Sequence, residues 1–516
     1  MDDLESRLSG LILAGFDGTA LSRETAQFIA GTAGTVLFGR NLATPDSTRA
    51  LVDELQSARP PSRPPLLVAT DQEGDPVSRL DALGSHWPSA MALGAVGDAS
   101  LTRAVYRCMG TELRALGITV DFAPVADVNT NPANPVIGLR SFGGDAAAVS
   151  VHVDAAIRGL HDAGVAATAK HFPGHGDTGA DSHFEAVATE QTEHQIREIH
   201  LAPFRAAIEA GVEMVMTGHV SAPALDASGA PATLSRNLLT DLLRGQLGFE
   251  GVICTDDMEM RGLEAGDDAA VVALDAGADL LLFAGMERAR RALERIRRAM
   301  SQGRLEAPRL HASLARVDAL RAVTRIADAS AAAGDGVALT REVARRSIAI
   351  VRARGGVPPF VLTPGARVLI VNFIEGGASR ATGARVESAL GVAIAAAGYR
   401  ATEQLRDLDP AGHEYKQVLM AAQTADAFIA VTRRAHLHQL QAQAVADLAL
   451  FGKPVVVVAA LEPYDAAALP DDMAVIASFG DGEAALRAAA EVLLGTASAA
   501  GRLPVSIAPR HETAQM

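Results

Sequence analysis

Short apolar runs alternate with longer segments of helical period from residue 10 to about residue 330. The runs are almost continuously hydrophobic, which is typical of parallel strands buried on both faces. Between them, stretches such as "LTRAVYRCMGTELRALG" place apolar residues three and four positions apart, as on one face of an amphipathic helix. The runs that we interpret as strands are 11–16, 35–39, 66–71, 119–125, 166–172, 212–219, 251–257 and 278–285.

This alternation of strands and helices predicts an α/β fold, with a (β/α)8 TIM barrel at the N-terminus. A doubly wound parallel sheet is the alternative. The barrel is favoured because charged side chains collect where the apolar runs end, and barrel active sites are assembled from the C-terminal ends of several strands. The residues at these ends are Asp71, Asp121, Lys170, His171, His219, Asp256 and Asp257.

A second alternation of apolar runs and helical segments follows a Gly- and Pro-containing stretch, "RARGGVPPF". It predicts a smaller α/β domain with a mostly parallel sheet, and it contains neither a dinucleotide-binding G-x-G-x-x-G nor a P-loop. We therefore expect the barrel over 1–335, a helix and linker over 336–362, and the second domain over 363–516. Its expected strands are 366–373, 426–432, 453–461 and 473–480.

Composition narrows the class of protein. The chain has 516 residues, 49% of them hydrophobic and 21% charged, and a formal net charge of −15. That charge argues against nucleic acid or an anionic membrane as the main partner. The acidic start lacks the apolar segment of a secretion signal, so we expect a soluble, cytoplasmic protein. Cys108 and Cys254, the two cysteines, are expected to be buried thiols.

The densest cluster of ionisable residues is "AKHFPGHGDTGADSHFE" at 169–185. Asp181 and His183 are close enough for the carboxylate to fix the tautomer of the imidazole, which suits a general acid/base. His171 and His175 have the spacing of two metal ligands on a helix, but a proline and glycines interrupt any helix there. We therefore expect no metal and no cofactor, with a metal-dependent hydrolase as a weaker alternative.

Two further sets of polar residues indicate sugar chemistry. Asp256 and Asp257 follow an expected strand, and a carboxylate in that position can attack an anomeric carbon in a retaining mechanism. Periodicity does not decide which of the two points inward, and either could instead cap the next helix. Asp71, Arg79 and Arg140 could bind sugar hydroxyl and amide groups, or form structural ion pairs.

These motifs resemble those of glycoside hydrolase family 3. "TDQEG", "DFAPVADVNTNPANPVIGLRSFG", "AKHFPGHGDTGADSH", "MTGHV" and "TDDMEM" occur in the family's order, and they are most similar to its β-N-acetylglucosaminidase branch. The second domain, with its "GRLPVSI" end, resembles the αβα sandwich of the longer members. One departure is Asp75, which stands where the family usually has a second glycine after "DQEG".

The resemblance implies a role for each matching residue. Asp256 is implied as the nucleophile and His183, oriented by Asp181, as the acid/base, while Asp257 stays unassigned. The residues implied to hold the N-acetylglucosamine, or in the case of His219 to line its pocket, are Asp71, Arg79, Arg140, Lys170, His171 and His219. Of these implied roles, that of Arg79 is the one most affected by the departure at Asp75.

The expected function is that of a retaining exo-β-N-acetylglucosaminidase acting on short muropeptides or chitooligosaccharides, in peptidoglycan recycling. A short substrate fits an aromatic content of 4% and a single tryptophan, Trp87, which we expect in the core. Because a neutral imidazole repels an incoming anion less than a carboxylate does, a phosphorylase is one alternative. A non-catalytic sugar-binding protein is another. The sequence leaves the oligomeric state open.

Overall fold

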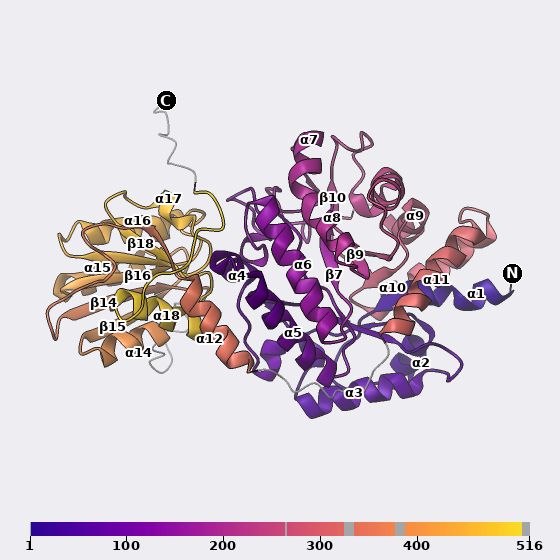
Figure 1. Ribbon diagram of the computed structural model, residues 1–516, viewed down its shortest axis with the longest axis horizontal. Helices are drawn as coiled ribbons and strands as arrows, with labels where there is room; N and C mark the ends of the chain where they lie inside the picture. Colours follow the sequence, from indigo (N-terminus) through magenta and orange to yellow (C-terminus); the bar gives the residue numbers. More distant parts are fainter. Residues whose placement is uncertain (1, 264–265, 325–334, 377–387, 508–516) are drawn as a thin grey trace. The chain divides into compact units, whose positions relative to one another are not determined.

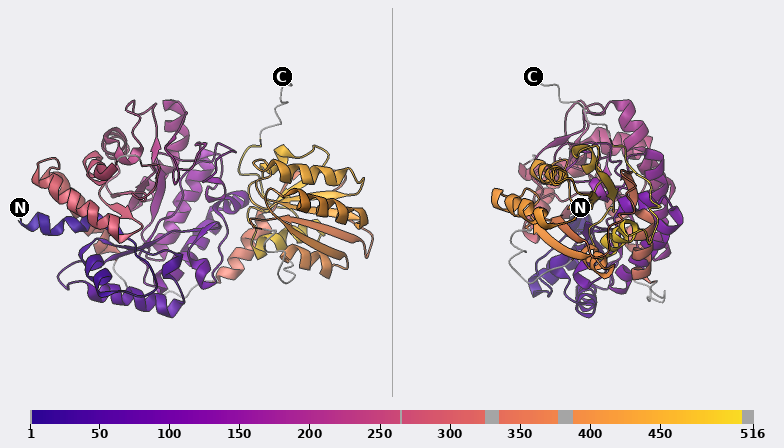
Figure 2. Two further views of the ribbon diagram at one scale, coloured as in Figure 1. Left: turned by 180° about the vertical axis from the view of Figure 1, so that it is seen from behind. Right: turned by 90° about the vertical axis from the view of Figure 1, so that its left-hand side faces the viewer.

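A computed structural model describes residues 2–263, 266–324, 335–376 and 388–507. The chain forms two compact units (Figures 1 and 2). The first comprises Met1–Trp87 and Ala99–Val337; the second comprises Pro88–Asp98 and Ala338–Met516. The second unit thus includes a short segment, with helix α4 (Ala90–Val96), that interrupts the first unit along the sequence.

The first unit is a closed barrel of eight parallel strands, as the pattern of apolar runs predicts. Five strands pair in the order β12-β1-β2-β3-β6 and three in the order β11-β9-β7. Single bridges, Val120 to Ala166 and Cys254 to Leu280, join the two sheets and close the barrel. The strands are β1 (Ile12–Ala14), β2 (Gly34–Val36), β3 (Leu67–Thr70), β6 (Val120–Asp121), β7 (Thr168–Phe172), β9 (Met214–Thr217), β11 (Val252–Thr255) and β12 (Leu281–Phe283).

Helices surround these strands (Figure 1). Their starts follow local sequence signals: α3 has the Thr44 side chain as N-cap and Pro45 at its first turn, and Asp145 caps α6. The helices of this unit are α1 (Asp2–Arg7), α2 (Arg23–Gly31), α3 (Pro45–Ala58), α5 (Ala99–Ala115), α6 (Ala146–Asp162), α7 (Glu193–Gln195), η5 (Ile196–His200), α8 (Ala202–Glu209), η7 (Asn237–Gln246), α9 (Ala269–Ala276), α10 (Met286–Ser301) and α11 (Ala307–Val323).

The barrel interior is filled by alternate residues of the strands, since neighbours along a strand point to opposite faces. Apolar side chains such as Leu67, Met214 and Leu282 form one buried cluster, which Val317 and Leu320 of α11 join. Beyond this layer the strands end in polar residues, which places the candidate site above the apolar core. The loops that follow the strands contain short elements: β4 (Gln72–Gly74), β5 (Val77–Ser78), β8 (Val187–Ala188), β10 (Val220–Ser221), η2 (Gly39–Asn41), η3 (Leu80–Leu83), η4 (Gly138–Arg140), η6 (Ala232–Leu234) and η8 (Gly266–Asp268). A further short helix, η1 (Leu8–Leu11), precedes β1.

The second unit is an αβα sandwich around a six-stranded sheet of order β13-β18-β17-β16-β14-β15, with only the β13 edge antiparallel. Alternate residues of the central strands pack on opposite layers. Ile370 joins a core with α14 and α18, whereas Leu369 joins one with α15 and α16. The elements are α12 (Gly336–Ser347), β13 (Ala349–Arg352), β14 (Arg367–Phe373), α14 (Ala389–Ala396), β15 (Arg400–Arg406), α15 (Gly412–Thr424), β16 (Ala427–Thr432), α16 (Gln439–Ala449), β17 (Val455–Ala459), α17 (Asp465–Ala468), β18 (Ala474–Ala477) and α18 (Glu483–Leu493).

The four expected strands of this unit are present, and two edge strands were missed. β15 is half-exposed and largely polar, so it lacks the apolar run that marks a buried strand. β13 lies in the segment 336–362 that the sequence suggested as a helix and linker, and it pairs with β18. Trp87 is 4% exposed, and both cysteines are buried and free, as expected.

Candidate active site

The ends of β3, β4 and β7 carry a buried ionic network. Lys170, at 2% exposure, lies 2.8 Å from an oxygen of Asp71 and 2.6 Å from one of Glu73. Arg140 donates two hydrogen bonds to the Glu73 carboxylate, at 2.7 and 2.9 Å. Arg79 reaches the same network, since its Nη2 lies 3.4 Å from Asp71 Oδ2.

The charges in this network stabilise one another. Burial acts to raise the pKa of Glu73, but the charges of Arg140 and Lys170 outweigh it and hold that pKa well below its usual range. Burial likewise acts to lower the pKa of Lys170, but the charges of Asp71 and Glu73 raise it. The Glu73 carboxylate is therefore ionised and the Lys170 ammonium group is protonated near neutral pH.

Asp121, at the end of β6, is a buried carboxyl group whose pKa shifts in the opposite direction to that of Glu73. It is fully buried, and its Oδ1 accepts a hydrogen bond of 2.9 Å from the Gln72 amide. Burial raises its pKa well above the usual range. This carboxyl group therefore binds its proton more tightly than an exposed aspartate does.

His171 connects the network to a further carboxylate, Asp127. Its Nδ1 lies 2.8 Å from Asp127 Oδ2, and its Nε2 lies 3.2 Å from Nη2 of Arg140. Because the guanidinium can only donate, Nε2 accepts and the His171 proton resides on Nδ1, facing Asp127. Asp127 also accepts the amide of His175 at 2.7 Å, so one buried carboxylate orients both the side chain of one histidine and the backbone of the next.

The two adjacent aspartates after β11 face different surroundings. Asp256 is buried beside Lys170, His171 and His219. Burial acts to raise its pKa, but its interactions with these side chains and a hydrogen bond from the Asp257 amide lower the pKa below its usual range. The Asp257 side chain turns away to accept the amides of Glu259 and Ala284, at 3.0 and 3.1 Å. Burial raises the pKa of Asp257 to about 6. Asp256 thus ionises more readily than Asp257, and Asp257 fixes the chain at the strand end.

His219 contacts the backbone of this pair. Its Nδ1 is 2.8 Å from Thr233 Oγ1 and its Nε2 is 2.9 Å from the Asp257 carbonyl oxygen. The carbonyl can only accept, so Nε2 carries the proton and Nδ1 accepts from the threonine hydroxyl. Burial lowers the pKa of His219. Both ring nitrogens are engaged within the protein, which makes this histidine a neutral support of the strand end.

The loop after β7 carries the remaining two predicted residues. His183 Nδ1 lies 2.7 Å from Asp181 Oδ1, and the same oxygen accepts the His183 amide at 2.9 Å. The imidazole side chain is 53% exposed, in contrast to the buried groups of the network. Asp181 therefore holds the ring with Nε2 facing outward, the arrangement that the sequence predicts for a general acid/base.

Hydrogen bonds on two sides hold this loop in place. On one side, both ring nitrogens of His175 are hydrogen-bonded: Nδ1 lies 2.6 Å from Thr178 Oγ1, and Nε2 lies 3.0 Å from Ser182 Oγ. Burial lowers the pKa of His175 to about 4. On the other side, the Ser182 and His183 carbonyl oxygens accept the amides of Gly262 and Arg261, at 3.1 and 3.3 Å. The loop that bears His183 is thus joined to the loop that follows Asp256.

The structure thus brings the nine predicted site residues into this cluster or onto its rim, with His219 fully buried and interacting with Asp256 and His171. Sequence reasoning missed Glu73 and Asp127. Both lie inside the motifs "TDQEG" and "DFAPVADV", at strand ends where a second carboxylate could have been suspected. Among the described residues, no group of three or more histidine, cysteine, aspartate or glutamate side chains is arranged to hold a metal ion.

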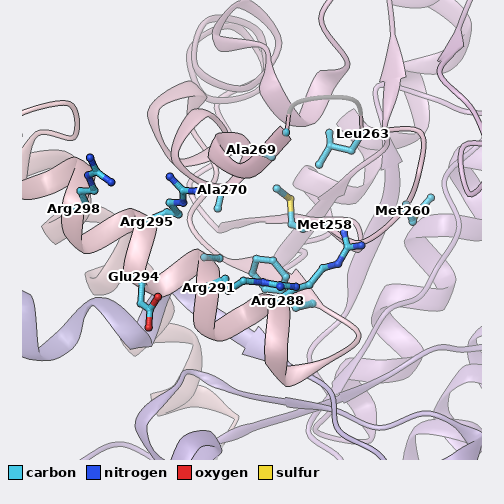
Figure 3. Close-up of a pocket in the computed structure, with 13 residues that line it drawn as sticks. Met258, Met260, Leu263, Ala269, Ala270, Arg288, Arg291, Glu294, Arg295 and Arg298 are labelled. Carbon is cyan, nitrogen blue, oxygen red and sulfur yellow. The ribbon is translucent and has the colours of Figure 1, made fainter.

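A separate cavity of about 770 Å³ borders the segment after β11 (Figure 3). Met258, Met260 and Leu263 line it from that segment, and α10 contributes arginines, among them Arg288 and Arg291. Its described lining includes none of the cluster's carboxylates or histidines. The candidate active site is therefore the polar cluster, and this cavity lies apart from it.

Comparison with known families decides the class of protein. The model of the glycosyl hydrolase family 3 N-terminal domain matches residues 4–320, and that of the family's C-terminal domain matches residues 286–516. The chain belongs to glycoside hydrolase family 3. It is therefore a two-domain glycoside hydrolase, as the motifs had indicated, and its barrel and sandwich are the two domains of that family.

Individual relatives agree with this assignment. A glycoside hydrolase family 3 β-N-acetylglucosaminidase from Paenibacillus sp. str. FPU-7 has 37% sequence identity and a TM-score of 0.89, over 98% of this chain and 99% of that one. A β-hexosaminidase of Pseudomonas aeruginosa is 37% identical over 56% of this chain and 88% of its own length. β-Hexosaminidase A of Pseudoalteromonas piscicida is 35% identical over 61% of this chain, and the match spans 57% of that relative.

No helix among the described residues is long and apolar enough to cross a membrane.

Proposed function

We propose that this glycoside hydrolase is a retaining exo-β-N-acetylglucosaminidase that removes terminal N-acetylglucosamine from chitooligosaccharides or short muropeptides. The observation that carries the proposal is the pairing of a buried, ionised Asp256 with an exposed His183–Asp181 dyad on an adjoining loop. The names of the most similar proteins support the sugar, since they are a β-N-acetylglucosaminidase and β-hexosaminidases.

In the first step, an Asp256 oxygen attacks the anomeric carbon while the bond from that carbon to the bridging oxygen breaks. Nε2 of protonated His183 donates its proton to the leaving oxygen, and Asp181 stabilises the imidazolium through the 2.7 Å contact with Nδ1. In the second step, neutral Nε2 takes a proton from water as the water oxygen attacks the glycosyl ester. Asp256 is released as a carboxylate, and the sugar leaves with its original β configuration.

The buried network supplies the groups that would hold the sugar. Lys170 and Arg140 are kept protonated by Glu73, and Asp71 is an acceptor for hydroxyl groups between Lys170 and Arg79. Charged donors and acceptors with fixed geometry discriminate strongly between a substrate that satisfies them and one that leaves them unpaired. We therefore assign Asp71, Arg79, Arg140, Lys170 and His171 to glycone recognition, whereas His219 supports the pocket from below.

The decisive experiment compares aryl β-N-acetylglucosaminide with aryl β-glucoside, each with and without phosphate. We expect hydrolysis of the first, a much slower reaction of the second, and free N-acetylglucosamine rather than its 1-phosphate. The retaining mechanism is tested by proton NMR of the first-formed anomer and by mass spectrometry of enzyme trapped with a slow fluorosugar. A label on Asp257, an α-anomer formed first, or a sugar phosphate as product would refute the corresponding part of the proposal.

A further inference from the structure

Phe184 is an exposed aromatic side chain directly after the proposed proton donor. It is 70% exposed, and it is the sole aromatic among the exposed large hydrophobic residues of the described chain. Its ring centroid lies 6.4 Å from that of His183, with the planes at 50°. An aromatic ring that stays in water beside the proposed proton donor is available to contact a molecule bound there.

The loop fixes Phe184 in this outward position. The Asp181 carbonyl oxygen accepts the Phe184 amide at 3.0 Å, which closes a tight turn. The preceding Ser182 points the opposite way, with its hydroxyl 3.0 Å from the buried His175 ring and its carbonyl oxygen accepting the Gly262 amide. Because the backbone is held on both sides, Phe184 presents its ring without a further change of the loop.

The chemistry of proton donation locates this ring relative to the substrate. A general acid lies within hydrogen-bond distance of the oxygen that it protonates, so His183 must contact the bridge between sugar and leaving group. The buried network around Lys170 occupies the sugar side. A residue next to His183 on the open side of the loop therefore borders the leaving group. Aromatic faces bind ring-shaped partners through dispersion and the C–H groups of the ring.

We propose that Phe184 is the wall of the leaving-group subsite and that it selects leaving groups with a ring, either a pyranose or an aryl group. This inference rests on the proposed function and deepens it. The glycone would be recognised by buried charges, and the leaving group by one exposed aromatic face. Leaving groups without a ring, such as methanol, would gain nothing from Phe184.

The test measures kcat/KM of wild type and Phe184→Ala on three β-N-acetylglucosaminides with different leaving groups: methyl, phenyl and a second N-acetylglucosamine. We expect a loss of about five- to tenfold for the phenyl glycoside and the disaccharide and less than twofold for the methyl glycoside, and Phe184→Trp should restore the loss. Val323→Ala, which truncates a 72% exposed side chain of α11, is the matched control and should change none of the three.

Transfer to an added acceptor gives a second measurement, because acceptors enter through the leaving-group subsite. Phe184→Ala should lower the ratio of transfer to hydrolysis with N-acetylglucosamine as acceptor and leave it unchanged with methanol. Equal losses on all three substrates, or no loss, would overturn the inference. A changed sedimentation coefficient with unchanged selectivity would overturn it too, by showing a contact between copies. A wild type inert on all three glycosides would instead refute the proposed function itself.

Discussion

Replacing Glu73 by glutamine tests whether the buried network holds the Lys170 and Arg140 cations in place. Glu73 is 4% exposed and bonds both Lys170 and Arg140, at distances of 2.6 to 2.9 Å. Glutamine has the same size, but it removes the negative charge and points an amide donor at two groups that can only donate. Arg140 then keeps weaker partners, while Lys170 retains Asp71.

The expected cost follows from leaving a buried cation without its counter-charge. Breaking a buried ion pair on one side typically costs about 3 to 5 kcal/mol, and the remaining Asp71 contact puts this case near 3 kcal/mol. The effect depends on pH because the pKa of folded Glu73 lies far below its unfolded value of 4.5. Its contribution to the free energy of unfolding is complete above that unfolded pKa and is lost as the pH falls. At pH 3.5 the loss is about 1.4 kcal/mol.

Urea unfolding followed by the fluorescence of Trp87 measures this quantity for the barrel, because the chain's single tryptophan is buried in the first unit. We expect Glu73→Gln to be less stable by about 3 kcal/mol at pH 7 and by about half as much at pH 3.5. Glu193→Gln, which removes an exposed i,i+4 partner of Arg197, is the control and should cost less than about 0.5 kcal/mol. Equal stability of Glu73→Gln and wild type at pH 7, or a deficit independent of pH, would refute the reasoning.

Four further changes separate the roles within the site. Asp256→Asn should abolish turnover while Trp87 fluorescence shows an intact barrel, and retained activity would exclude Asp256 as the nucleophile. Asp257→Asn should stay active and should gain about 1 to 3 kcal/mol over wild type as the pH rises from 4 to 7, since a carboxyl with a raised pKa is destabilising once ionised; urea titrations at the two pH values check this. His183→Ala should slow poor leaving groups about 100-fold or more and activated aryl glycosides far less, and equal losses would argue against proton transfer. Gly262→Ala would place a Cβ 2.3 Å from the Ser182 carbonyl oxygen, so kcat/KM should fall on every substrate. Gly31→Ala in α2, whose Cβ would meet its nearest neighbour at 3.9 Å, is the control.

The strands of the fold were predictable wherever both faces of a strand are buried, because such strands are apolar along most of their length. All eight barrel strands and the four central strands of the sandwich are buried, and each expected run overlaps one of them. The edge strand β15 was missed because it is only partly buried, and its sequence "RATEQLR" therefore mixes polar with apolar residues. The transfer of Pro88–Asp98 to the second unit has no local signal either. That segment reads as an ordinary helix, and its placement depends on long-range contacts such as the Ser89 hydroxyl donating to the Phe479 carbonyl oxygen.

The site was predictable to the extent that its chemistry lies in contiguous motifs. The resemblance pointed to Asp256, His183 and Asp181, and periodicity left Asp256 and Asp257 equivalent until the backbone amides that bind Asp257 were known. Glu73 and Asp127 were missed because their partners lie far away in the chain, 67 residues apart for the pair with Arg140 and 44 for the pair with His171. Contacts between such distant segments leave no characteristic spacing of residues in the sequence.

The contrast between the two halves of the site has a consequence for specificity. Lys170 and Glu73 are nearly inaccessible and are held by several partners, so under the proposed roles they cannot rearrange to pair with a sugar that presents its polar groups differently. His183 and Phe184 are exposed on a loop tip, where one mismatched contact is readily solvated and costs about 1 kcal/mol. On the proposed function, burial thus favours strict selection of the glycone and graded selection of the leaving group. An enzyme built in this way can accept leaving groups of many lengths while it removes one kind of sugar.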